Sequence, residues 1–147
     1  MKALKALLSI ATAALLCGVA VGAAAQQMEP YGDHEVHYSA IPTGLLTDQV
    51  AQARGIVRSR SKALLLVTIL ENGEPVTGAV QASVWASNDD DPTDIPMRQV
   101  RENGWVSYIG TFDFESGQSR NFAVSANPHG REGPFELTFR QALQNPD

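Results

Sequence analysis

Three histidines and a methionine are the residues of this sequence that could bind a transition metal. His34 and His37 stand three apart in a segment with strand-like alternation, so their side chains should point to opposite faces of a sheet. His129 lies in a polar loop, and Met97 follows a proline. Imidazole and thioether groups are ligands that copper accepts, and imidazole also suits zinc. We expect no metal or other cofactor, and keep a copper- or zinc-handling role for His34, His37, His129 and Met97 as an alternative.

Two groups of carboxylates could serve acid–base chemistry or bind calcium. Asp113 and Glu115 are two apart on a predicted strand and share a face, as the carboxylate pair of a glycosidase does. A carboxylate-based hydrolase or lyase is therefore a further alternative. The acidic loop 88–94 holds Asn88, Asp89, Asp90, Asp91 and Asp94. It has neither the bend glycine nor the distal glutamate of an EF-hand, and a solvated loop explains its composition equally well.

Catalysis by a nucleophile is not expected. The sequence contains no Gly-x-Ser-x-Gly elbow, and its one cysteine, Cys17, precedes the predicted mature chain. We therefore predict no catalytic residue and expect that the protein is not an enzyme.

The concentrated positive charge of the sequence lies between positions 54 and 62. On an extended segment, Arg58, Arg60 and Lys62 would share one face. Such a face could dock an acidic partner or an anionic lipid head group. Alternatively, it could be edge-strand charge that prevents sheet-to-sheet aggregation. We expect a partner contact on this face, on the surface around Tyr38 and on the short helical segment 45–55. The partner-binding candidates are Tyr38, Arg58, Arg60 and Lys62.

Short apolar segments separated by turn residues must position these side chains. Asn72-Gly73 and Asn103-Gly104 are tight-turn signals, and residues 62–71 are apolar on both faces, as in a central strand. Pro96 marks its segment as a sheet edge. The predicted strands are residues 34–41, 62–71, 79–87, 95–101, 105–114, 121–126 and 135–141.

One segment has helical rather than strand character. Residues 45–55 offer Thr47 or Asp48 as the N-cap and end at Gly55. We predict one short helix of two to three turns after the first strand. The whole pattern indicates an all-β fold, an antiparallel immunoglobulin-like β-sandwich of about seven strands, with a small closed barrel as the alternative.

The N-terminus has the features of a cleavable export signal. Lys2 and Lys5 precede the Ala/Leu-rich stretch 6–16, and three alanines at 23–25 supply small residues for cleavage. Lipid attachment at Cys17 and retention as a membrane anchor are the alternatives. We predict a signal peptide over residues 1–25, a single β-sandwich domain over residues 26–147, and a periplasmic location.

Removal of that signal would change the charge of the protein. The 122 residues that remain carry 9 basic and 16 acidic side chains, a net charge of −7, and no cysteine. One domain of this size excludes a multidomain enzyme, and its negative charge excludes a basic nucleic-acid binder. After cleavage, the chain should not span a membrane.

Several segments resemble a family of small exported bacterial proteins known as domain of unknown function 4426. The resemblance lies in residues 32–42, 46–55, 56–59, 62–65 and 137–141, in that order and at that spacing. It implies a single immunoglobulin-like sandwich behind a signal peptide and carries over no catalytic residue. The hairpin segment 71–79 is similar to many extracellular sandwich modules. We therefore expect a non-catalytic periplasmic binding or protein-interaction module whose partner is an unknown envelope protein or small ligand.

Overall fold

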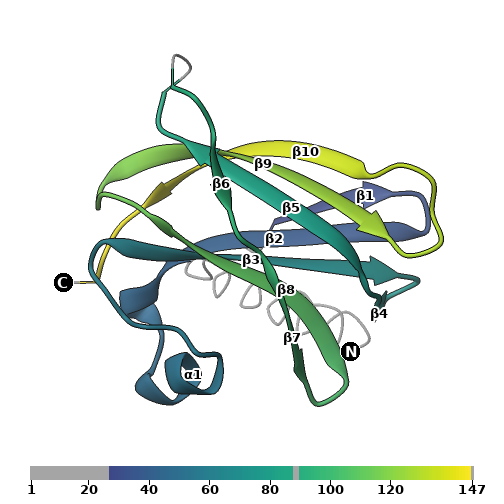
Figure 1. Cartoon of the computed structure of the whole chain (residues 1–147), viewed down its shortest axis with the longest axis horizontal. Helices are drawn as coiled ribbons and strands as arrows, with labels where there is room; N and C mark the ends of the chain where they lie inside the picture. Colours follow the sequence, from purple (N-terminus) through teal and green to yellow (C-terminus); the bar gives the residue numbers. More distant parts are fainter. Residues whose placement is uncertain (1–26, 88–89, 147) are drawn as a thin grey trace, which may run out of the picture.

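The computed structural model describes residues 27–87 and 90–146. These residues form two antiparallel sheets packed face to face (Figure 1). The predicted signal segment 1–25, with Cys17, and the loop residues Asn88 and Asp89 lie outside the described residues. The strands are β1 (Gln27–Tyr31), β2 (His34–Pro42), β3 (Lys62–Glu71), β4 (Glu74–Pro75), β5 (Gly78–Trp85), β6 (Thr93–Ile95), β7 (Arg98–Glu102), β8 (Trp105–Asp113), β9 (Gln118–Pro128) and β10 (Phe135–Leu143).

The first sheet has the order β1-β2-β3-β8-β7, with β4 paired to β3, and the second has the order β10-β9-β5-β6. Their facing sides share one core, because alternate residues of each strand point inward. Phe122 of β9 is completely buried there, stacked on Phe139 at 4.6 Å and in an edge-to-face contact with Phe112 at 5.2 Å. This confirms the predicted antiparallel β-sandwich.

Two predicted tight turns are present. Asn72 and Gly73 have φ values of 51° and 83°, and Asn103 and Gly104 have values of 51° and 80°. Positive φ at both central positions is the type I′ geometry that joins two twisted strands, and Asn-Gly tolerates it best. These turns fix the β3–β4 and β7–β8 hairpins.

The prediction of about seven strands was too low. Strand β1 was missed because its residues are mostly exposed and include Pro30, which hides any alternation. Strand β4 has only two residues. The segment 95–101, predicted as one strand, is divided between β6 in one sheet and β7 in the other. Pro96 lacks an N–H donor, so the ladder stops there and the chain crosses between the sheets.

The predicted helix is present but shorter than expected. A 3-10 turn, η1 (Thr43–Leu45), precedes α1 (Asp48–Ala53). The Thr47 side chain caps α1 by accepting a hydrogen bond from the Val50 amide at 3.2 Å. Gly55, at φ 66°, ends the helical segment as predicted.

Helix α1 lies on the side of the first sheet that faces away from the second sheet (Figure 1). There Ala51 and Ile56 bury Leu64 and Ile109 in a small second core. Residues 43–61, which connect β2 to β3, thus form an excursion attached to the outer face of this sheet. Within the described residues, no helix is long and apolar enough to cross a membrane.

Candidate functional site

The structure places the first two histidines on opposite faces of β2, as the spacing predicted. The His34 ring lies 5.3 Å from the ring of Phe135 on the inner side, and its Nε2 is 3.2 Å from Glu71. His37 is on the outer side, with its Nε2 2.9 Å from Glu35. The strand therefore holds these two imidazoles apart.

Of the other two metal candidates, His129 has a hydrogen-bond partner of its own and Met97 is far from His34. His129 follows β9, and its Nδ1 is 2.9 Å from the Thr77 hydroxyl. Met97 lies in the crossing between the sheets, against Gly110 of β8. Gly110 pairs with Leu65, whereas His34 pairs with Glu71, six residues farther along β3. At 3.3 Å per residue, that is about 20 Å. Among residues 27–87 and 90–146, no three His, Cys, Asp or Glu side chains gather as a metal site.

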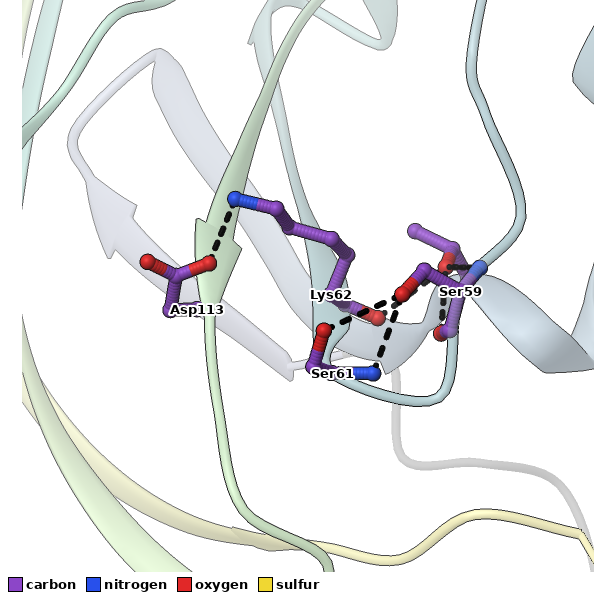
Figure 2. Close-up of polar contacts among 5 residues, drawn as sticks. Ser59, Ser61, Lys62 and Asp113 are labelled. Atoms are coloured by element: carbon purple, nitrogen blue, oxygen red, sulfur yellow. Dashed lines mark hydrogen bonds and ion pairs between the residues drawn. The ribbon is translucent and has the colours of Figure 1, made fainter.

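The two candidate catalytic carboxylates have different partners. Asp113 ends β8 and forms an ion pair with Lys62, which begins β3 (Figure 2). Glu115 lies beyond the strand and accepts a hydrogen bond from Gln118 at 2.7 Å. Both carboxylates are exposed. In the acidic loop, Asp90 accepts a hydrogen bond from the Ser87 amide at 3.0 Å.

The loop that carries the basic residues is held in one conformation by a completely buried hydroxyl. Thr43 Oγ1 lies 3.0 Å from the carbonyl of Ser59 and 3.1 Å from that of Lys62, and accepts from the Ser59 amide at 2.9 Å. The Ser59 and Ser61 hydroxyls are also hydrogen-bonded, at 3.1 Å (Figure 2). On the far side, the Asn145 amide donates to the Arg60 carbonyl at 2.7 Å. The backbone is thus fixed while its cations face solvent.

The three predicted cations do not lie on one extended strand. Arg58 is in an irregular segment, Arg60 is in a turn, and only Lys62 belongs to β3. Arg58 donates to Asp48 of α1 at 2.6 Å and to the Gly44 carbonyl at 3.0 Å. The expectation of an alternating strand was therefore wrong, because the Thr43 hydrogen bonds turn the chain at this point. Arg58 and Arg60 still line one hollow, together with Gly44 and Asn145. Lys62 lines a different hollow, whose other charged side chains include Asp90, Asp91, Asp94 and Asp113.

Tyr38 does not belong to this surface. It alternates with Val36 and Ala40 on the inner face of β2, is 7% exposed, and packs 4.5 Å from the ring of Phe139. Burial, with a smaller effect of the charge of Glu29, raises the pKa of its hydroxyl above the usual 10.0. Its contribution is to the core, so its proposed role in partner contact is withdrawn.

A second group of cations, of which the sequence singled out only Arg54, lies at the other end of α1. Arg54 pairs with Glu102 of β7 at 3.1 Å, and the Arg98 guanidinium donates to the Arg54 carbonyl. Arg101 joins them around a cavity of about 550 Å³, which the exposed ring of Trp105 also lines. Arg98 and Trp105 are more than forty residues from Arg54 in sequence, so only the fold shows that they are neighbours.

Exposed apolar side chains gather in the same region. Leu45 is 52% exposed, Val50 39% and Val57 82%, and all three belong to the 43–61 excursion. Trp105, beside the Arg54 cavity, is 49% exposed. We call these four side chains and the five surrounding cations the α1 face; its cations are Arg54, Arg58, Arg60, Arg98 and Arg101.

Comparison with solved structures extends these observations. A DUF4426 family protein from Pseudomonas aeruginosa PAO1 is 25% identical, with a TM-score of 0.72 over 83% of this chain and 97% of that one. FetP from uropathogenic Escherichia coli strain F11, expressed in the periplasm, has 9% identity and a TM-score of 0.61 over 84% and 96% of the two chains. A copper-bound FetP variant has 9% identity and a TM-score of 0.58 over 80% and 93%. The likeness to FetP is one of fold alone.

No curated protein matches the chain. The sequence pattern of the family described as a domain of unknown function, DUF4426, matches residues 28–145. This range contains all of β2 to β10, the excursion and the whole α1 face. The chain belongs to the DUF4426 family.

Proposed function

We propose that this protein is a non-catalytic periplasmic module that binds another component of the cell envelope through its α1 face. The observation that carries the proposal is the distribution of charge. Five of the nine Lys and Arg residues after position 25 lie on this face with two acids, and the rest of that chain has four basic and fourteen acidic side chains. The molecule therefore presents one basic face to an acidic partner while its other faces repel one.

The arrangement of the loop supports a binding role. Cations on a fixed backbone lose less conformational entropy on binding than cations on a mobile segment. Thr43 and Asn145 fix the loop from two sides. The ion pairs of Arg54 and Arg58 are partly exposed, so each contributes little to stability, roughly 0–1 kcal/mol. The concentration of charge there is thus better explained by binding than by folding.

The test is recovery of envelope components by the purified protein. Crosslinked envelope extract would be captured with the native protein and with a variant carrying Arg58→Glu and Arg60→Glu. We expect the variant to lose the recovered material. Reversal of Arg131 and Arg140, which lie outside the α1 face, serves as the control with a similar number of charge changes. Equal recovery by both variants would remove the α1 face from the proposal.

The periplasmic location rests on the N-terminal sequence and has its own test. The protein would be expressed with its complete N-terminus, and the mass of the periplasmic product would be measured. We expect the mass of residues 26–147. A product that keeps residues 1–25 and stays in the membrane fraction would support the anchor alternative instead.

Metal handling is the second candidate, and one observation favours it. His34 contacts Phe135 at the start of β10, and His129 directly follows the end of β9. Both histidines therefore flank the β9–β10 connection at one end of the sandwich. Calorimetric titration with Cu(I), Cu(II) and Zn²⁺ tests this role, with His34→Ala and His129→Ala as variants. Affinity weaker than about micromolar, or no change in the variants, would exclude it.

A carboxylate hydrolase or lyase is the weakest candidate, since Asp113 and Glu115 are exposed and held by different partners. An activity screen with Asp113→Asn and Glu115→Gln tests it. Turnover that both substitutions abolish would overturn the non-catalytic proposal.

A further inference from the structure

We infer that the envelope component bound by the α1 face is the surface of an anionic lipid bilayer, on which the protein docks without crossing it. This inference rests on the proposed function and names its partner. It is carried by the combination of exposed aliphatic and aromatic side chains with arginines on one protruding part of the fold. The charge of the face would attract the protein to the lipid, and its apolar side chains would enter the lipid interface.

The charge of the face matches that of the bilayer. Five cations and two acids, Asp48 and Glu102, lie on this face, while the rest of the chain is strongly acidic. An anionic bilayer attracts cations within about one Debye length and repels the acidic remainder. The protein is therefore oriented before contact, with α1 toward the lipid.

The apolar side chains stand where they would enter the lipid interface. Val57 is 82% exposed and Leu45 52%, one on each side of α1 in the chain. Exposure of aliphatic groups to water is unfavourable, whereas their burial in the lipid interface is favourable. Trp105 adds an indole, a side chain that favours the boundary between head groups and acyl chains.

The fold makes these side chains accessible. The excursion projects from the outer face of the first sheet, away from the body of the sandwich (Figure 1). Its own small core, around Ile56 and Leu64, keeps it rigid without using Leu45, Val50 or Val57. The exposed apolar groups are therefore not needed to hold the excursion together. Their dispersal among arginines along a projection suits a planar lipid surface better than the concave pocket of a protein partner.

Vesicle binding tests the inference. Exported protein purified from the periplasm would be sedimented with vesicles of equal parts phosphatidylglycerol and phosphatidylcholine, and with vesicles of phosphatidylcholine alone. We expect binding to the anionic vesicles only, reduced at least about tenfold when Arg58 and Arg60 are both changed to Glu. Raising the salt to about 0.5 M, where the Debye length is near 4 Å, should also weaken it.

Two substitutions locate the contact. Val57→Asp should weaken vesicle binding at least about fivefold, because it removes an inserted apolar group and adds a charge that the lipid repels. Met28→Asp is the matched control, since Met28 is 44% exposed on β1, outside the α1 face. Thermal unfolding of both variants establishes that they fold. Equal loss of binding in the two variants would overturn the assignment of this face.

Tryptophan fluorescence provides a readout of the environment of the α1 face itself. The sequence has two tryptophans, Trp85 and Trp105, and a Trp85→Phe background reports on Trp105 alone. Its emission should shift to shorter wavelength with anionic vesicles. Absence of both sedimentation and shift would overturn the inference. If charge reversal still abolished recovery of an envelope protein, the proposed function would stand with an acidic protein as the partner.

Discussion

Tyr38 shows that a residue's position on a strand decides whether its side chain is buried or exposed. Its alternation with Val36 and Ala40 puts it on an apolar face, yet it was predicted to contribute to a partner-binding surface. The structure buries it at 7% exposure against Phe139. Strand alternation was therefore the better guide than residue type, because alternate side chains must share the environment of their face.

Burial of Tyr38 predicts a dependence of stability on pH. Its pKa is raised in the folded protein, so in alkali the unfolded chain loses the proton first. The stability that follows from this raised pKa is fully present below about pH 10. It is lost as the pH rises through the pKa of Tyr38 in the folded protein. The Tyr38→Phe variant should therefore lose less stability than the native protein between pH 9 and 11. Urea unfolding at each pH measures this, and parallel curves would contradict it.

Thr43 is the residue on which the shape of the basic loop depends. Thr43→Val should destabilise the protein by about 1–3 kcal/mol, because it leaves the Ser59 amide and the Ser59 and Lys62 carbonyls without their partner. Thr111→Val, at an exposed position of β8, is the matched control and should change little. Urea unfolding gives both free energies. An equal effect in the two variants would show that the Thr43 hydrogen bonds do not hold the loop.

At the scale of elements, the crossing between the sheets depends on Gly110. A Cβ there would lie 2.6 Å from both the Pro96 carbonyl oxygen and the Met97 sulfur. Gly110→Ala should therefore destabilise the protein by about 1–3 kcal/mol, since backbone must move to admit the methyl group. Gly44→Ala is the control, because its nearest contact would be Pro146 at 3.6 Å. Similar unfolding midpoints for the two variants would contradict this account of the crossing.

The elements that the sequence predicted were those whose signals are local. Asn72-Gly73 and Asn103-Gly104 fix their turns by themselves, and Thr47 and Gly55 bound the helical segment. The division of residues 95–101 was not predictable from Pro96 alone, because a proline marks the end of pairing without showing which sheet the chain joins next. The arginines of β7 meet Arg54 only through that crossing, so half of the candidate site was hidden in the sequence.

At the scale of the whole molecule, the sandwich separates two kinds of surface. The α1 face contains most of the basic side chains after position 25. It also contains the exposed apolar side chains Leu45, Val50 and Val57 of the 43–61 excursion. The two-sheet core holds the sandwich without them, so the face could vary without loss of the fold. Composition alone reported only a net negative charge; the fold shows that this charge is unevenly distributed.

Photocrosslinking in living cells tests most directly whether the α1 face meets the envelope. A photoreactive amino acid would replace Val57 in one strain and Met28, exposed on β1, in another. Our account predicts that irradiation attaches lipid or envelope protein at position 57 and little or nothing at position 28. Equal adducts at the two positions, or adducts at 28 alone, would contradict it.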